Sequence, residues 1–323
     1  MRQKNIYRFV VFLIAGMLFA IPTWAKESQP RQSYTELAKD AATGNTTALT
    51  TLKQAAHAGN IDAEALLGAL YANGHGLDQD YRKAYEWSHK AALHGIAKSE
   101  TMLGFLYRGG KGVAKNYGKA RQWFRKAAIK GNAIAEGCLG SMFLQGQGVV
   151  RDYTKAAKWT HKAAKLGYAK AEYDFGCLYF HGWGVSKNYA QAIYWWKKAA
   201  AQNNINALNN LASLYLHGQG VPQSYVEAAK WWSKATVKGN AVAEYDLGIL
   251  YANGNGFAKN DVKALQWWML ARVDADPGTA VFNNTGAFIP RLESGMSAAE
   301  IKEAHTAARK IYLARQPQHQ AEK

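Results

Sequence analysis

The chain has 323 residues, a formal net charge of +17 and two cysteines. This length is sufficient for a large buried core. The excess of Lys and Arg favours acidic partners or anionic surfaces, with a well-solvated basic surface as the simpler reading. Neither Cys138 nor Cys177 has a CxxC neighbour or a metal-ligand spacing, which argues against a zinc site and against thioredoxin-type chemistry.

The N-terminal segment 1–25 has the pattern of a secretory signal. Basic residues precede an apolar run over 9–21, and cleavage is expected after Ala25. The alternative is an uncleaved membrane anchor, although the run is short for a helix that must cross about 30 Å of hydrocarbon. We therefore expect an exported chain that has no transmembrane segment in its mature form and no nucleic-acid partner.

Residues 26–60 are expected to form a linker and a degenerate helix pair that caps the N-terminal end. The segment 54–60 resembles the end of the units that follow, and Thr51 stands where those units have a tryptophan. Terminal units of a repeat array need a more polar outer side, and this segment fits that requirement.

A 36-residue period divides the next part of the chain into six units. The predicted units are 61–96, 97–132, 133–168, 169–204, 205–240 and 241–276. A glycine column consists of Gly68, Gly104, Gly140, Gly176 and Gly248, with Ala212 in the fifth unit. A tryptophan column consists of Trp87, Trp123, Trp159, Trp195, Trp231 and Trp267. A fixed period of this size is the signature of a solenoid, in which one small unit stacks on its own copies.

Each unit is predicted to contain a helix, a tight glycine loop, a second helix and a turn. In the first unit Ala63, Leu67 and Leu70 recur at helical spacing, and Asp80 is suited to cap the second helix. Because glycine inside a helix costs about 1 kcal/mol relative to alanine, its recurrence indicates close helix packing. The tryptophan column is predicted to fill the space between helices rather than to form a stacked ligand site. A second tryptophan in the last three units predicts the heaviest packing there, at Trp196, Trp232 and Trp268.

Residues 277–313 are expected to cap the C-terminal end. An irregular stretch is predicted from 276–278 through 282–284, and a helix is predicted after Ser297, which forms a capping box with Glu300. The apolar stripe of that helix would cover the open end of the solenoid. The polar segment 314–323 is expected to be disordered.

The repeated sequence strings of the six units resemble the Sel-one-like repeat, a relative of the tetratricopeptide repeat. In the second unit the matching strings Leu-Gly-x-x-Tyr, Gly-x-Gly-Val, Lys-Ala-x-x-Trp and Lys-Ala-Ala occupy 103–107, 110–113, 119–123 and 126–128. The resemblance implies an all-α fold, a right-handed α/α superhelix of six helix-loop-helix repeats with helical caps at both ends. The chain is also similar to exported members of the family from Gram-negative bacteria. This similarity implies a periplasmic or secreted protein that acts in envelope assembly, in signalling or in contact with a host cell.

Three departures from the repeat pattern leave local helix geometry around the fifth unit open. Phe143 replaces tyrosine, Asn203 replaces the glycine that ends a unit, and Ala212 replaces the packing glycine. The cysteines leave a second point open. Cys138 and Cys177 fall on similar faces of neighbouring predicted helices, but packed helices usually lie about 8–10 Å apart and a disulfide needs Cα atoms within about 7 Å.

No catalytic motif is found, and we expect a non-catalytic chain without a cofactor. The sequence lacks a nucleophile elbow, a Walker A loop and an HExxH motif. His181 and His217 share one column, where a polar capping role is favoured over metal binding. Recurring glutamates near first-helix starts and lysines near second-helix ends complement the helix dipoles, with a polyanion track along the lysines as the alternative. The lysine column consists of Lys90, Lys126, Lys162, Lys198 and Lys234.

Function is expected where the columns vary between units. First-helix positions opposite the packing face are predicted to line a concave groove. The candidate partner-binding residues are Phe105, Arg108, Tyr173, Asp174, Asn209, Asn210, Tyr245 and Asp246. This polar and aromatic set suits a protein or peptide segment, and an unspecialised solvent-facing surface is the alternative.

The predicted function is therefore an exported scaffold that binds a protein or peptide partner in its groove. One alternative is a small-ligand-binding or hydrolytic protein, because some exported relatives in the family are linked to penicillin binding or hydrolysis. Those relatives carry a disulfide in nearly every repeat, which this chain does not. Another alternative is a polyanion-binding protein that contacts an anionic envelope or host-surface component.

Overall fold

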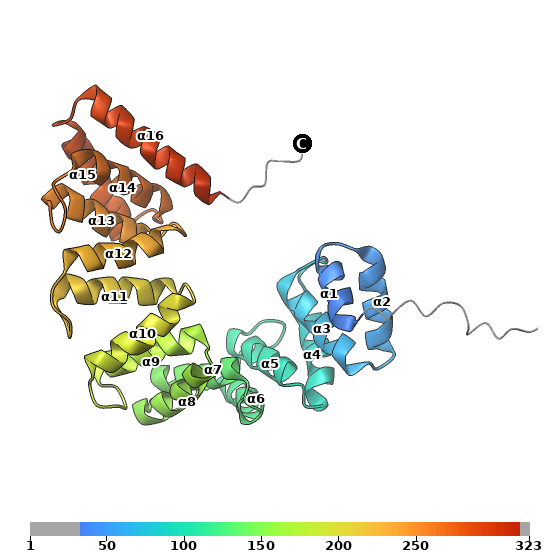
Figure 1. Ribbon diagram of the computed structural model, residues 1–323. Coiled ribbons are helices and arrows are strands. Elements are labelled where there is room, and N and C mark those ends of the chain that lie inside the picture. Colours follow the sequence, from blue (N-terminus) through green and yellow to red (C-terminus); the bar gives the residue numbers. More distant parts are fainter. Residues whose placement is uncertain (1–32, 317–323) are drawn as a thin grey trace, which may run out of the picture.

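The computed structural model describes residues 33–316, so the predicted signal segment and residues 317–323 lie outside the described part. Sixteen helices and no strands form between Ser33 and Gln316. Figure 1 shows the helices stacked pair by pair into an open, curved array, with α1 at one end and α16 at the other. None of the described helices is long and apolar enough to cross a membrane.

Each predicted unit contains one pair of antiparallel helices. The first helices are α3 (Ile61–Asn73), α5 (Ala97–Gly109), α7 (Ala133–Gln145), α9 (Ala169–His181), α11 (Ile205–His217) and α13 (Ala241–Asn253). The second helices are α4 (Tyr81–Leu93), α6 (Tyr117–Ile129), α8 (Tyr153–Lys165), α10 (Tyr189–Ala201), α12 (Tyr225–Thr236) and α14 (Asp261–Asp274). The flanking helices are α1 (Tyr34–Ala42), α2 (Thr46–His57), α15 (Ala280–Glu293) and α16 (Ala298–Arg315). The all-α helical solenoid is confirmed.

Capping chemistry sets where the helices begin. The side chain of Asp80 accepts backbone N–H groups of the first turn of α4, and the equivalent residue does so in each later unit. Ser297 and Glu300 form the predicted capping box of α16. Asn203 has a φ of 59°, and it is the one described residue other than glycine with a positive φ. Because asparagine tolerates this left-handed conformation, it replaces the terminal glycine without changing the repeat.

The loop between the two helices packs on the preceding unit. Gly112 in the second unit has a φ of 71°, and a Cβ added there would lie 2.2 Å from the carbonyl oxygen of Tyr81 in the first unit. No side chain fits at that distance. The glycine therefore provides both the backbone conformation and the contact that joins one repeat to the next.

The glycine column packs against the residue that follows each column tryptophan. A Cβ added to Gly176 would lie 2.4 Å from Cδ1 of Trp196, and one added to Gly248 would lie 2.3 Å from Cδ1 of Trp268. The column tryptophans lie where two repeats meet, as when the Trp123 ring meets the His89 ring of the preceding repeat edge-on at 6.0 Å. Trp195 contacts both sides, with ring centres 6.0 Å from His161 of the preceding repeat and 5.3 Å from Phe175 of its own. The column tryptophans thus fill space between helices, as predicted.

Burial of the tryptophans follows from these positions. Trp87 and Trp195 of the column are 7% exposed, whereas the other four are half-buried. The second tryptophans are more uniformly buried, with exposures of 2% for Trp196, 3% for Trp232 and 7% for Trp268. The core cluster that includes Trp196 and Trp232 extends from Ala192 to Leu250, across the fourth to sixth repeats. The largest buried cluster of the described residues therefore lies in the repeats that carry the second tryptophan.

The C-terminal cap contains a helix that the sequence analysis missed. The stretch predicted to be irregular through 282–284 forms the first turns of α15. The Arg272 side chain stabilises this turn, because its Nη1 donates to the carbonyl oxygen of Phe282 at 2.9 Å and its guanidinium lies over the Phe282 ring. Two asparagines and the internal Pro290 had obscured the helical pattern.

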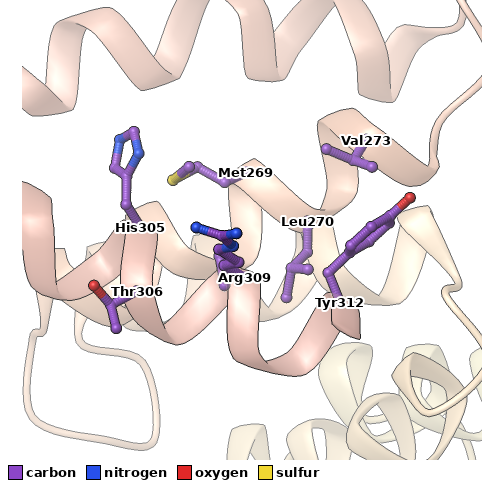
Figure 2. A pocket seen from close by; sticks show the side chains of 8 residues that line it. Met269, Leu270, Val273, His305, Thr306, Arg309 and Tyr312 are labelled. Atoms are coloured by element: carbon purple, nitrogen blue, oxygen red, sulfur yellow. The ribbon is translucent and has the colours of Figure 1, made fainter. Parts of the chain in front are cut away.

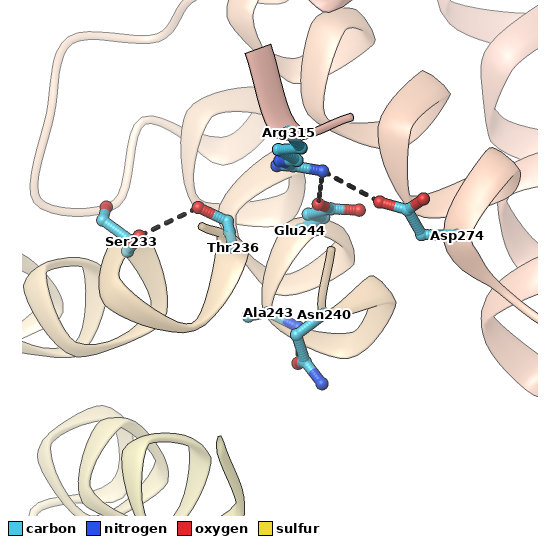
Figure 3. Close-up of polar contacts among 7 residues, drawn as sticks. All are labelled: Ser233, Thr236, Asn240, Ala243, Glu244, Asp274 and Arg315. Atoms are coloured by element: carbon cyan, nitrogen blue, oxygen red, sulfur yellow. Dashed lines mark hydrogen bonds and ion pairs between the residues drawn. The ribbon is translucent and has the colours of Figure 1, made fainter. Parts of the chain in front are cut away.

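Helix α16 closes the open end of the stack. It lies along α14, and a hollow of about 420 Å³ between them is lined by Met269, His305 and Tyr312 among others (Figure 2). At its last residue, Arg315, an Nη1 lies 2.6 Å from a carboxylate oxygen of Glu244 and 2.8 Å from one of Asp274 (Figure 3). The helix thus includes the first two residues of the segment predicted to be disordered.

Candidate protein-binding wall

The first helices form the inner side of the curved stack. Helix α3 contacts α5, and α5 contacts α7, in addition to the contacts within each pair. Elements on the inner side of a curved array approach one another most closely, so these helices line the concave face. We call the face formed by α5, α9, α11 and α13 the inner wall. All eight predicted partner-binding residues lie on these four helices.

At its N-terminal end the inner wall contains a hollow of about 740 Å³ between α3 and α5. Phe105 and Arg108 line it together with Met102, Tyr81 and Lys111. The Arg108 guanidinium lies 5.1 Å from the centre of the Phe105 ring, and this cation–π contact holds both side chains at the edge of the hollow. The hollow thus combines an aromatic surface with two cations.

In the middle of the inner wall the predicted residues are engaged with one another and with their neighbours. The Asn210 amide nitrogen lies 3.9 Å from Sγ of Cys177, and the Lys170 ammonium lies 2.7 Å from a carboxylate oxygen of Asp174. The Asn209 amide donates to Asn240 at 3.1 Å. Burial raises the pKa of Tyr173 above its ordinary value, so its hydroxyl stays protonated. This part of the wall is a half-buried polar network.

Both cysteines are free thiols in the structure, so the disulfide considered from the sequence is not formed. Burial raises the pKa of the Cys177 thiol to about 11. It also raises the pKa of the Cys138 thiol, against the opposing effects of Arg108 and Lys170. The thiolate is the reactive form of cysteine, so both side chains are held unreactive.

At the C-terminal end a second hollow of about 570 Å³ lies between α13 and the cap helix α15. Tyr245 lines it, and its hydroxyl accepts a hydrogen bond from the Asn284 amide of α15 at 3.0 Å. The Tyr245 ring also stacks on Phe288, with ring centres 6.2 Å apart. Arg291 of α15 and Lys259 add two cations to the rim. The α15 residues of this hollow were not predicted, because the sequence pattern of that helix does not indicate a helix.

Asp246 differs from the other predicted residues because none of its described neighbours pairs with it. Burial alone raises its pKa to about 6. The equivalent carboxyl two repeats earlier, Asp174, also has a raised pKa, but there Lys170 opposes the effect. An unpaired, desolvated carboxyl on a concave surface is a candidate contact for a cationic group of a partner.

The lysine and glutamate columns have structural partners. Each column lysine lies over the ring of the tryptophan three residues before it, with Nζ 4.1–4.9 Å from a ring centre. The column glutamates are buried, and Glu100 pairs with Lys130 at 2.6 Å. Glu136 forms no ion pair within residues 33–316, and burial raises its pKa, with Lys162 opposing the shift. Helix-dipole complementarity alone therefore does not describe these columns.

One of the two histidines considered for metal binding, His181, has aromatic contacts. The His181 ring stacks on Trp183, with ring centres 4.3 Å apart. Across residues 33–316 there is no group of three or more His, Cys, Asp or Glu side chains that could hold a metal ion.

The stacked pairs and the concave wall define the chain as a helical-repeat solenoid. Six segments match the Sel1 repeat family, namely 61–96, 97–132, 139–168, 169–204, 205–240 and 241–271. The chain therefore belongs to the Sel1 repeat family, whose members are generally protein–protein interaction scaffolds. No curated protein matches the chain.

Two solved structures are similar to this chain. One is c5321, a protective antigen of uropathogenic Escherichia coli strains with an SLR fold, at 29% identity and a TM-score of 0.69. The match covers 86% of this chain but 62% of that one, so this chain spans less than two thirds of that protein. The other is a Sel1 repeat protein from Oxalobacter formigenes, also at 29% identity and a TM-score of 0.69, which covers 75% of this chain and all of that one.

Proposed function

We propose that this chain is an exported, non-catalytic scaffold that holds a protein or peptide segment against its inner wall. The observation that carries the proposal is the pair of hollows at the two ends of that wall, of about 740 and 570 Å³. Phe105 and Arg108 line the first and Tyr245 lines the second. Aromatic and arginine side chains around concave, partly apolar surfaces are the usual anchors of protein interfaces.

The export part of the proposal is supported by the N-terminal sequence pattern of 1–25, which is typical of proteins sent to the periplasm or out of the cell. Within that setting the narrower roles are envelope assembly, signalling or contact with a host cell. The similar structure from uropathogenic Escherichia coli is a protective antigen, which favours testing host contact first. Fractionation of cells that express the full chain would test export, and a protein that stays in the cytoplasm would contradict it.

Photo-crosslinking from defined positions tests the binding surface. One photoreactive residue replaces the half-buried Ser213 on α11, a helix of the inner wall, and the control replaces the exposed Gln191 on the second helix α10. We expect partner adducts from position 213 and none from position 191 in the cell envelope. Adducts from both positions, or from position 191 alone, would move the site away from the wall.

A matched pair of tyrosine variants adds a second test. Changing Tyr173 and Tyr245 to alanine should abolish capture of the crosslinked partner while the helical circular dichroism signal is kept. Tyr194→Ala is the control, because this tyrosine is 52% exposed on α10. Undiminished capture by the double variant would contradict the assignment of these residues.

A further inference from the structure

A fourth hollow lies among α6, α7 and α8, outside the four helices of the inner wall. It has a volume of about 480 Å³ and is located where α6 of the second repeat meets α7 and α8 of the third. Leu139, Phe143 and Trp159 form its apolar floor, while Arg121, Arg125 and Lys155 contribute cations. We call this hollow the α6–α8 slot.

The neighbouring junctions fill the equivalent position with an imidazole ring. His161 stacks on Phe175 with ring centres 4.8 Å apart and meets Trp195 at 6.0 Å. In the first junction His89 stacks on Tyr85 and meets Trp123. The residue one repeat after His89 and one repeat before His161 is Arg125. The tryptophan is shared by these three junctions, whereas Leu139 and Phe143 of the slot correspond to Leu103 and Tyr107 in the first junction and to Phe175 and Tyr179 in the third. Of these three junctions, the α6–α8 slot is the one with no imidazole ring at this position.

The cations of the slot are available to a partner. Between residues 33 and 316 neither Arg121 nor Arg125 has a carboxylate or hydrogen-bond partner, whereas Lys155 pairs with Asp152 at 2.9 Å. Helices α6 and α8 each carry four Lys or Arg side chains and no acidic residue within their bounds. The other second helices carry fewer cations, and three of them, α4, α12 and α14, also carry acids. The positive potential is therefore concentrated around the slot.

We propose that the α6–α8 slot is a second docking site, which takes an aromatic or large aliphatic side chain flanked by carboxylates from an acidic segment of a partner protein. The apolar side chain occupies the place that His89 and His161 hold in the neighbouring junctions. The flanking carboxylates pair with Arg121 and Arg125, whose planar guanidinium groups bind carboxylates in a bidentate manner. A sulfated polysaccharide would satisfy the cations but would leave the floor of Phe143 and Trp159 uncovered.

Fluorescence anisotropy with a labelled heptapeptide of three glutamates, one phenylalanine and three glutamates tests this site. Replacing the phenylalanine by glycine should weaken binding about tenfold, which corresponds to loss of one well-buried apolar contact. Arg125→His introduces the imidazole ring found in the neighbouring junctions and removes one cation. We therefore expect the affinity for the phenylalanine peptide to be at least roughly tenfold weaker. Equal affinity for the phenylalanine and glycine peptides would overturn the proposal.

The chain offers a matched control for the charge change. Lys197 occupies the position equivalent to Arg125 two repeats later, so Lys197→His makes the same replacement at another junction. We expect Lys197→His to bind the peptide within about twofold of the unmodified chain. An equal loss in both variants would indicate general attraction to a basic protein and would overturn the proposal.

Two further measurements distinguish binding in the slot from a loss of folding and from attraction of any polyanion. Arg121→Gln lowers the charge at the rim without plugging the slot, and it should weaken binding severalfold even if Arg125→His lowers the melting temperature. A heparin hexasaccharide should bind the unmodified chain and Arg125→His with similar affinity. A heparin affinity that falls with Arg125→His while the peptide affinity does not would reassign the slot to polysaccharide.

Discussion

The glycine column supports two different kinds of packing in two sets of repeats. In the first and third repeats the residue opposite the glycine is small, and a Cβ added to Gly68 or Gly140 would lie 3.0 or 3.1 Å from a backbone nitrogen of the second helix. In the fourth and sixth repeats the three atoms nearest to such a Cβ all belong to an indole. The same glycine therefore allows close backbone approach in one set and accommodates a tryptophan in the other.

The tryptophan repeats also connect the core to the inner wall. The Trp196 Nε1–H donates to the carbonyl oxygen of Tyr173 at 3.1 Å, and that of Trp268 donates to the carbonyl oxygen of Tyr245 at 3.2 Å. Both tyrosines are wall residues. Trp232 packs beside Ala212 in the fifth repeat and makes no equivalent bond within the described part of the chain. In the fourth and sixth repeats, core packing thus positions the side chains that face a partner.

Removing one indole is expected to give the largest difference in stability between the two sets of repeats. Trp196→Ala leaves a large cavity and a lost hydrogen bond, and we expect a loss of about 3–5 kcal/mol in the free energy of unfolding. Thr160→Ala at the equivalent position of the third repeat should cost about 1 kcal/mol. Urea unfolding followed by circular dichroism measures both. Equal losses would show that the two kinds of packing are energetically the same.

Filling the space above the glycine gives the next largest effect. Gly176→Ala places a methyl group 2.4 Å from the Trp196 indole, so we expect a net loss of about 1–3 kcal/mol despite the better helix propensity of alanine. The fifth repeat provides the reciprocal variant, Ala212→Gly, which should cost about 1 kcal/mol through helix propensity alone. A stabilised Gly176→Ala protein would mean that the indole shifts freely, as the natural Ala212 arrangement requires.

Much of this architecture could be predicted from the sequence, because each position of the unit occurs six times and the six equivalent residues can be compared. The capping role of Asp80 follows from local chemistry that the period makes visible, whereas the effect of Asn203 on the repeat was left open and is seen only in its positive φ. Helix α15 has no copy elsewhere in the chain, and its two asparagines and Pro290 conceal its pattern. The half of the C-terminal hollow that α15 contributes could not be found for the same reason.

The contacts that the column residues make were the other feature that could not be predicted from the sequence. The spacing places a tryptophan on one face of a helix, but it does not distinguish packing within a unit from packing against the preceding one. The α6–α8 slot depends on such a difference, because Arg125 becomes informative only when the contacts of His89 and His161 are known. Sequence columns indicate which positions are equivalent, and the structure shows what each position touches.

The C-terminal cap allows a third comparison, between the sixth repeat and the earlier ones. Arg315 contacts the fully buried Glu244 and the nearby Asp274. Burial raises the pKa of Glu244 to about 8, with Arg315 opposing the shift. Arg315→Ala should cost roughly 1–2 kcal/mol through loss of the ion pair with Asp274. The cost is less than for a fixed buried charge, because Glu244 with a pKa of about 8 is already largely protonated at neutral pH. Hydrogen exchange should then accelerate in α16 and not in α3, and unchanged exchange in α16 would show that the ion pair does not hold the cap.

The smallest effect concerns the two wall carboxyls, and it depends on pH. Asp246 has a folded pKa of about 6, above its ordinary value, because burial disfavours the charged form. The folded chain therefore binds this proton more tightly than the unfolded chain, and stability falls as pH rises from about 4 to about 6. Asp246→Asn cannot ionise, so at pH 7 the variant should be more stable by on the order of 1 kcal/mol, with no gain at pH 4.

Asp174→Asn is the control for this prediction, because Asp174 pairs with Lys170 and its replacement also removes an ion pair. The gain in stability at pH 7 should be smaller for Asp174→Asn than for Asp246→Asn. Melting temperatures between pH 4 and pH 7 measure both, and a pH-independent difference for Asp246→Asn would contradict the assignment. The ionised carboxylate of Asp246 lowers the stability of the free protein and lies on the inner wall. A cationic side chain of a bound partner could pair with it and remove this loss of stability. Binding of a cationic segment should therefore strengthen over the same pH range in which the free chain loses stability.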